Sequence, residues 1–224
     1  MRRLPRPVTH VVFDLDGVLL DTEPLYTAAT CRIVGRFGRS FDWSLKSAMM
    51  GRPALESARI VVERLDLPLP AETFHAERTA ILAELLPEAA AMPGAPELVA
   101  ALATRRVPMG IATSSPRSLV EPTLARHRAW LASVEVIVTG DDPRILRGKP
   151  APDIYLVAAR DLGAAPAACV AIEDAPVGVE AAHAAGMQVI AVPDARLVDR
   201  ARVETMATLV VASLAELDPA TLGL

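Results

Sequence analysis

Five short apolar segments recur along the chain, and a sixth is weaker. Apolar side chains follow one another in them without strict alternation with polar ones, a pattern typical of strands that are covered on both faces in a parallel sheet. We therefore predict strands at residues 10–14, 109–114, 134–140, 169–174 and 188–192, and a weaker one at 208–212.

Alanine- and leucine-rich segments with helical spacing lie between these strands. The clearest are 97–105, 153–162 and 177–185, and Gly186 follows the last of them as a helix stop. Strands that alternate with helices predict the α/β class. The expected core is a doubly wound parallel sheet of the Rossmann-like type.

The segment from about residue 20 to residue 86 breaks this alternation. It is typical of three or four amphipathic helices and contains no convincing strand. Pro87 and the turn-forming run Met92-Pro93-Gly94 mark its far border. We predict an inserted α-helical domain at 20–87 and an α/β core formed by 1–19 and 88–224.

Composition predicts a globular chain with a sizeable core, because 52% of the 224 residues are hydrophobic and 22% are charged. No apolar run approaches the ~20 residues that span a bilayer, and residues 1–10 lack the apolar stretch of a signal peptide. Cys31 and Cys169 have no metal-ligand spacing and are interpreted as free thiols. We expect a cytoplasmic protein without a membrane partner.

The net charge of −4, the lack of a long basic cluster and the few aromatic residues argue against a nucleic-acid partner. A small ligand and a monomeric state are expected instead. Four histidines have no metal-ligand spacing and are interpreted as structural. They are His10, His75, His127 and His183.

Two carboxylates stand where the first predicted strand gives way to a turn, in Phe13-Asp14-Leu15-Asp16-Gly17. Side chains at i and i+2 share one face of a strand, and ligands of parallel sheets bind beyond the carboxyl ends of the strands. Carboxylates this close need a cation or a shared proton, and Mg²⁺ is the usual companion of a phosphate. A turn that favours Asp and Gly explains the pattern about equally well.

Hydroxyls and a lysine follow the next two predicted strands. Thr113, Ser114 and Ser115 end the second strand before a helix, where hydroxyls and backbone N–H groups can bind an anion. Helix capping by Ser115 is the simpler alternative. Lys149 follows the third strand and can neutralise a phosphoryl group, although most single lysines are solvated.

Glu173 and Asp174 follow the fourth predicted strand. An acidic pair after an apolar strand is costly without a partner. A metal ion opposite Asp14 and Asp16 would supply one.

Together these segments resemble, in order, the four motifs of the haloacid dehalogenase superfamily of phosphohydrolases. The likeness covers almost the whole chain, and the helical insert is similar to the small α-helical cap domain of that family. Within the superfamily the chain is most similar to the group of pseudouridine-5′-phosphatases and glycerol-3-phosphatases. The four motifs are Asp14-Leu15-Asp16-Gly17-Val18, Thr113-Ser114, Lys149-Pro150 and Glu173-Asp174.

The resemblance implies Mg²⁺-dependent hydrolysis of a small phosphate monoester, such as a pseudouridine 5′-phosphate-like, sugar or polyol phosphate. Asp14 would be the nucleophile that forms an aspartyl-phosphate, and Asp16 the acid and base. The metal would be held by the Asp14 carboxylate, the Asp16 backbone carbonyl and Asp174. Glu173 would act through a water molecule or from behind these ligands.

The resemblance also assigns the phosphoryl oxygens to Thr113, the Ser114 backbone N–H and Lys149. Thr113 and Lys149 complete the expected catalytic set with Asp14 and Asp16.

Substrate choice is expected to lie in the cap. Gly51 and Arg52 resemble the substrate-recognition loop of the family, although a solvated arginine is an equally good interpretation of Arg52. Tyr26 stands where phosphoglucomutases of the family usually have a histidine, so it argues against a mutase.

There are three alternatives to a phosphatase. A phosphosugar mutase of the β-phosphoglucomutase type would return the phosphoryl group to its substrate. A dehalogenase is disfavoured because such relatives lack an acid at the position of Asp16. A non-catalytic binding or regulatory protein on the same fold is disfavoured by intact Asp14, Asp16, Lys149 and Asp174.

Overall fold

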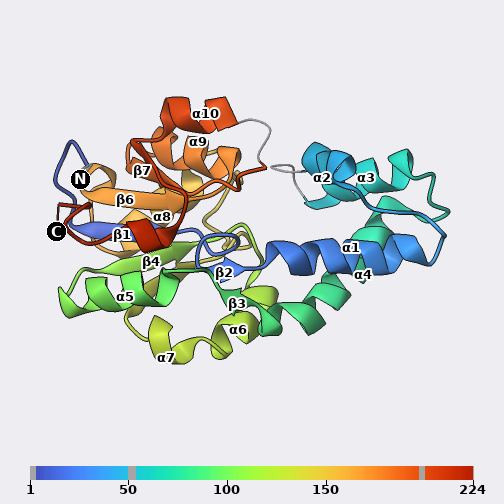
Figure 1. Ribbon diagram of the computed structural model, residues 1–224, viewed down its shortest axis with the longest axis horizontal. Helices are drawn as coiled ribbons and strands as arrows, with labels where there is room; N and C mark the ends of the chain where they lie inside the picture. Colours follow the sequence, from blue (N-terminus) through green and yellow to red (C-terminus); the bar gives the residue numbers. More distant parts are fainter. Residues whose placement is uncertain (1–3, 50–53, 197–199, 224) are drawn as a thin grey trace.

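The computed structural model describes residues 4–49, 54–196 and 200–223. Within them, six parallel strands form one sheet in the order β5-β4-β1-β6-β7-β8 (Figure 1). The prediction of an α/β fold with a parallel sheet is confirmed. The strands are β1 (His10–Phe13), β4 (Met109–Ala112), β5 (Val134–Val138), β6 (Cys169–Glu173), β7 (Gln188–Ala191) and β8 (Leu209–Val210).

Helices cover both faces of this sheet. Side chains alternate along each strand, so successive strand residues contact opposite helical layers. Val11 and Phe13 of β1 lie in an apolar cluster with Leu102 of α5, whereas Val12 lies in a second cluster with Tyr155 of α8. The first face is covered by α5 (Ala95–Thr104), α6 (Arg117–Ala125) and α7 (Arg128–Leu131), and the second by α8 (Asp153–Asp161), α9 (Pro176–Ala184) and α10 (Arg200–Met206).

The central pair β1 and β6 is where the strand order changes direction. The chain proceeds from β1 through β4 to β5 on one side and from β6 through β7 to β8 on the other. In open parallel sheets ligands bind beyond the carboxyl ends of the strands at such a switch point. The segments after β1 and β6 are therefore the expected place for a site.

The expectation that every strand is covered on both faces is wrong for β5. This strand lies at the edge of the sheet, and its burial alternates. Glu135 is exposed, and Ile137 is 39% exposed. An edge strand pairs with a neighbour on one side alone, so β5 lacks the continuous cover that the inner strands have.

Helices α1 to α4, within the residues that the structure describes, lie beside one end of the sheet (Figure 1). They have an apolar cluster of their own, to which Ile33, Leu45, Val61 and Phe74 contribute. A separate core supports our proposal that 20–87 is a cap domain inserted into a core of 1–19 and 88–224. The helices are α1 (Glu23–Gly35), α2 (Trp43–Met49), α3 (Ala54–Arg64) and α4 (Ala71–Leu85), and short 3-10 turns are η1 (Leu86–Glu88), η2 (Pro166–Ala168) and η3 (Leu214–Glu216).

A short strand pair joins this helical region to the sheet and corrects the prediction that 20–86 contains no strand. β2 (Leu20–Asp21) pairs antiparallel with β3 (Ala90–Ala91). Two residues are too few to show a period in the sequence, and alanine favours helices over strands. The pair holds side by side the two segments through which the chain enters and leaves the helical region.

Two smaller predictions concern the membrane and the cysteines. None of the helices within the described residues is both long and apolar enough to traverse a bilayer. Cys31 is exposed and Cys169 is buried, and both are free as predicted.

Candidate active site

Asp14 is the first residue after β1 and is only 6% exposed. Its backbone N–H donates to the carbonyl of Ile172 in β6 at 2.9 Å, which fixes it between the two central strands. Gly17 then turns the chain, with φ of +82° and an N–H that bonds to the Leu20 carbonyl at 2.8 Å. This left-handed turn favours glycine and places the first predicted motif at the switch point.

Asp174 lies against the same turn. A Cβ atom on Gly17 would lie 2.4 Å from the Asp174 Oδ2 atom, so glycine is required there for space as well as for its φ. The Asp174 carboxylate therefore faces the loop that carries Asp14 and Asp16. The structure brings the first and fourth predicted motifs together.

Lys149 joins the carboxyl ends of three strands. Its Nζ atom donates to Asp14 Oδ1 at 2.6 Å, to Glu173 Oε1 at 2.6 Å and to the Ala112 carbonyl at 3.1 Å. The side chain is 5% exposed, so it is not a solvated surface lysine. Burial disfavours the charged ammonium, but the carboxylates of Asp14 and Glu173 outweigh it and hold the pKa of Lys149 well above its usual value.

Glu173 uses both oxygens to hold its neighbours. Oε1 accepts from Lys149 and from the Tyr155 hydroxyl at 2.9 Å, and Oε2 accepts from the two backbone N–H groups that follow. A Cβ on Gly178 would lie 1.6 Å from Oε1, so the start of α9 closes over this carboxylate. The arrangement favours a role for Glu173 in positioning Lys149 over direct contact with a metal ion.

Asp16 belongs to a network of hydroxyls. Its Oδ2 atom accepts from Ser115 Oγ at 2.7 Å and from Thr113 Oγ1 at 3.2 Å, and the Tyr26 hydroxyl lies 3.2 Å from Ser115 Oγ. The alternative that Ser115 caps a helix is wrong, because α6 has Pro116 at its N-cap and no side-chain capping bond. Tyr26 thus links cap helix α1 to the carboxylate of Asp16.

The remaining predicted residues are placed less fully. Ser114 is exposed beside Thr113, where its backbone N–H remains a candidate for a phosphoryl oxygen. Gly51 and Arg52 lie outside the described residues.

Sequence reasoning missed three side chains that matter here. Helix capping is the simpler sequence interpretation of Ser115, Tyr155 lies in a segment with helical spacing, and no motif of the sequence points to Arg78 of the cap. The signal for Arg78 is its place in the buried stripe Ala71, Phe74, Arg78 and Leu82 of α4, where the helical period demands an apolar residue.

Negative charge exceeds positive charge at this site. Of four carboxylates here, those of Asp14 and Glu173 pair with the Lys149 ammonium, whereas no ion pair is described for those of Asp16 and Asp174. Burial, which outweighs the attraction of Lys149, raises the pKa of Asp14 to about 8. Burial and then the charge of Glu173 raise the pKa of Asp174 well above its usual value. Such a site favours a further cation.

The donor set fits Mg²⁺. Among the described residues, no three His, Cys, Asp or Glu side chains are already gathered as a metal cluster. The expected set does not need one, because it consists of the carboxylates of Asp14 and Asp174 and the backbone carbonyl of Asp16. Hard oxygens and uncompensated negative charge are what this ion prefers.

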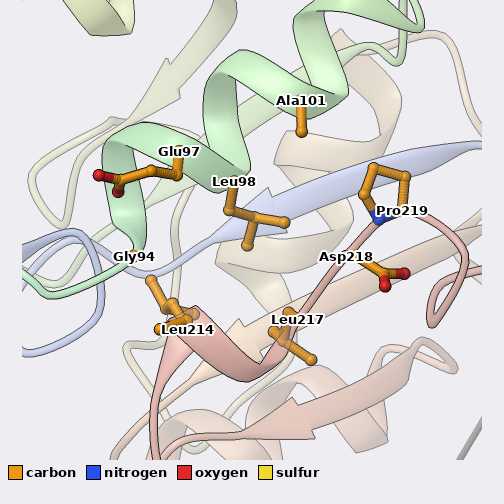
Figure 2. A pocket seen from close by; sticks show the side chains of 9 residues that line it. Gly94, Glu97, Leu98, Ala101, Leu214, Leu217, Asp218 and Pro219 are labelled. Carbon is orange, nitrogen blue, oxygen red and sulfur yellow. The ribbon is translucent and has the colours of Figure 1, made fainter. Parts of the chain in front are cut away.

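A separate pocket of about 480 Å³ lies between α5 and the C-terminal segment (Figure 2). Its lining shares no residue with the carboxylate–lysine site. It carries the acidic side chains of Glu97 and Asp218 beside Leu98, Leu214 and Leu217, and acidic walls repel phosphate. We do not assign the reaction to this pocket.

Comparisons with known proteins agree with the geometry. The family model described as haloacid dehalogenase-like hydrolase matches residues 8–186. (DL)-Glycerol-3-phosphatase 2 of Arabidopsis thaliana is 43% identical over 97% of this chain and 92% of its own length. A Drosophila melanogaster protein named "Probable pseudouridine-5′-phosphatase" is 43% identical over 98% of this chain and 95% of its own length.

A solved structure has a similar fold. The crystal structure of CbbY from Rhodobacter sphaeroides in complex with phosphate has a TM-score of 0.77 and 26% identity, covering 97% of this chain and 100% of that one. The prediction of an enzyme, a phosphoric monoester hydrolase, is confirmed by the family match and the phosphatase relatives. The chain belongs to the haloacid dehalogenase-like hydrolases.

Proposed function

We propose that the chain hydrolyses small phosphate monoesters with Mg²⁺ through an aspartyl-phosphate on Asp14. The observation that carries this is the contact of the buried Asp14 carboxylate with Lys149 at 2.6 Å, next to an Asp16 that is held separately by hydroxyls. Two carboxylates with different partners can take different roles, one as nucleophile and one as acid and base.

In the first step an oxygen of Asp14 attacks phosphorus, and the bond between phosphorus and the ester oxygen breaks. The leaving alkoxide takes its proton from the Asp16 carboxyl group. Lys149 already bonds Asp14 Oδ1, which orients the carboxylate and leaves Oδ2 for attack. This step produces the free alcohol and a phosphorylated Asp14.

In the second step Asp16 takes a proton from a water molecule, whose oxygen attacks the same phosphorus atom. The bond from Asp14 to phosphorus breaks, inorganic phosphate leaves and both aspartates return to their starting states. Ser115 and Thr113 hold Asp16 in place for both proton transfers, and a fixed general acid and base typically contributes 10²- to 10⁴-fold in rate, as an order of magnitude.

We assign the binding of the phosphoryl oxygens to Lys149, Thr113 and the Ser114 backbone N–H, which lie on the side of the site formed by the strand ends. When bound, Mg²⁺ supplies positive charge that lowers the pKa of the carboxyls and stabilises charge on the transferred group. We assign Asp14, Asp174 and the Asp16 carbonyl as its ligands. Glu173 would contact the ion through a water molecule or act indirectly by holding these ligands in place.

The names of the relatives support a substrate class, because they refer to phosphate esters of glycerol, pseudouridine and fructose. We propose a sugar-like or polyol phosphate as substrate, with a choice made by the cap. A mutase is less well supported, because the Tyr26 hydroxyl is hydrogen-bonded to Ser115 and the 43% identical relatives are phosphatases by name. Location in the cytoplasm and a monomeric state remain predictions.

Phosphate release is expected to require a divalent cation. Lys149 pairs with Asp14 and Glu173, which leaves the carboxylates of Asp16 and Asp174 without a described ion pair. EDTA should therefore abolish turnover of p-nitrophenyl phosphate, glycerol 3-phosphate and pseudouridine 5′-phosphate, and Mg²⁺ should restore it where Ca²⁺ does not. The measurement is phosphate release across this panel. Undiminished turnover in EDTA would exclude the metal, and no turnover of any phosphate ester with Mg²⁺ would favour a binding protein.

Replacing Lys149 with methionine is expected to lower kcat/KM by about 10²- to 10³-fold, because a buried cation on the phosphoryl group is lost. Methionine keeps much of the length and fills the same space. Lys46→Met is the matched control, since Lys46 lies in the cap and pairs with Glu23. A Lys149→Met enzyme within threefold of the parent, with circular dichroism unchanged, would contradict the assignment.

A further inference from the structure

Helix α4 of the cap buries an arginine in an otherwise apolar stripe. The buried residues of α4 are Ala71, Phe74, Arg78 and Leu82, which recur at the helical spacing of one face. Phe74 packs in the cap cluster, and Leu82 packs beside the core. Arg78 lies between them and is 7% exposed.

Arg78 lacks the partner that a buried charge normally has. Among the described residues no carboxylate pairs with it, and its buried Nε–H has no hydrogen-bond acceptor. Burial lowers the pKa of Arg78, and the neighbouring Tyr26 opposes this. An unsatisfied buried donor costs free energy of folding, so its presence points to an acceptor that arrives with a ligand.

The neighbours of Arg78 lead to the reacting groups. Leu82, one turn further along α4, packs with Leu119 of core helix α6, and the half-buried Tyr26 packs against the same cluster. Tyr26 lies close enough to Arg78 for each to influence the pKa of the other, and its hydroxyl bonds to Ser115 Oγ, which donates to the Asp16 carboxylate. Arg78 is thus at the junction of cap and core, on the cap side of the proposed acid and base.

His75 adds to this polar island. It precedes Arg78 by three residues on α4, and its buried Nδ1 atom also has no partner among the described residues. Two unsatisfied polar side chains at i and i+3 share a helix face. A single oxygen-rich ligand could satisfy both.

We propose that Arg78 is a specificity-determining residue that binds the alcohol half of the substrate, donating its guanidinium N–H groups to hydroxyl or carbonyl oxygens. The inference rests on the proposed function. Asp16 must lie next to the ester oxygen that it protonates, so the groups on the cap side of Asp16 face the leaving alcohol. The core supplies Lys149, Thr113 and Ser114 for the phosphate, which leaves the alcohol to the cap.

The test compares Arg78→Met and Arg78→Lys on two kinds of substrate. p-Nitrophenyl phosphate has an aryl leaving group with no hydroxyl, whereas glycerol 3-phosphate and pseudouridine 5′-phosphate offer several oxygens. We expect the ratio of kcat/KM for the better metabolite to kcat/KM for the aryl ester to fall by about 10- to 100-fold in Arg78→Met, as for loss of hydrogen bonds from a charged donor. Arg78→Lys should recover part of it.

The control is Arg59→Met, because Arg59 is an exposed arginine of cap helix α3; the ratio should not change there. Thermal unfolding separates binding from folding, since removal of an unpaired buried charge should not lower the melting temperature. An unchanged ratio in both Arg78 variants, or equal losses on aryl and metabolite substrates, would overturn the proposal for Arg78. Failure of the parent enzyme to hydrolyse even the aryl ester would instead overturn the proposed function.

Discussion

Asp14→Asn is expected to lower kcat by at least about 10³-fold while leaving the protein folded, as seen for removal of nucleophiles elsewhere. The amide has nearly the same shape and still offers Oδ1 to Lys149, which is 2.6 Å from that atom in the parent. It lacks the negative charge and the basic lone pair that attack phosphorus. The substitution therefore removes chemistry with little change in packing.

The measurement is phosphate release with saturating Mg²⁺, together with circular dichroism and thermal unfolding. Asp66→Asn serves as a matched control, because Asp66 is exposed in the cap and its φ of 49° suits asparagine. The control should keep the parent rate. Turnover of Asp14→Asn within tenfold of the parent would mean that Asp14 is not the nucleophile.

Asp16→Asn is expected to have a large effect that depends on the leaving group. Asparagine can still accept from Ser115 and Thr113, which contact Asp16 Oδ2, but it cannot transfer protons. We expect kcat on glycerol 3-phosphate to fall by about 10²- to 10⁴-fold. p-Nitrophenolate leaves without a proton, so the first step on the aryl ester should be affected least.

The second step still needs a base, so the phosphorylated enzyme should accumulate when Asp16→Asn is mixed with the aryl ester. Stopped-flow absorbance should show a burst of p-nitrophenolate that approaches one equivalent per enzyme, followed by slow turnover. Asp14→Asn should show no burst. Equal losses on both substrates with no burst would remove the acid and base role from Asp16.

The core fold was predictable from the sequence because its strands are buried. β1, β4, β6 and β7 are continuous apolar runs, and each lies within the segment predicted for it. The predicted segments ran one or two residues past each of these strands. Those extra residues include Asp14, Thr113 and Asp174. They directly follow the last residue of their strands, where side chains at the edge of the sheet can form a site.

The convergence of Asp14, Lys149 and Glu173 was expected from parallel topology alone. Parallel strands present their carboxyl ends at one edge, so polar residues that follow different strands must meet there. Their partners were not predictable in the same way. Tyr155 of α8 has an apolar ring that is typical of a core position. The bond from its hydroxyl to Glu173 depends on how α8 packs on the sheet.

The cap was predicted least well, and its chemistry depends on tertiary contacts. The pair β2–β3 is too short to show a pattern, and the contact between Tyr26 and Ser115 joins residues 89 positions apart. The loop of Gly51 and Arg52 lies outside the described residues, so its predicted role in substrate recognition stays a prediction. Arg78 offers a second cap residue with which to test substrate choice.

The central claim is a covalent phosphoryl group on Asp14, and acid-quench trapping tests it most directly. The enzyme with Mg²⁺ is mixed with substrate labelled in its phosphate, quenched in acid within milliseconds and digested for mass spectrometry. The account predicts a hydroxylamine-sensitive phosphoryl group on the peptide that contains Asp14, enriched in Asp16→Asn and absent in Asp14→Asn. Phosphate release at the parent rate without any labelled protein, or with label on another residue, would contradict it.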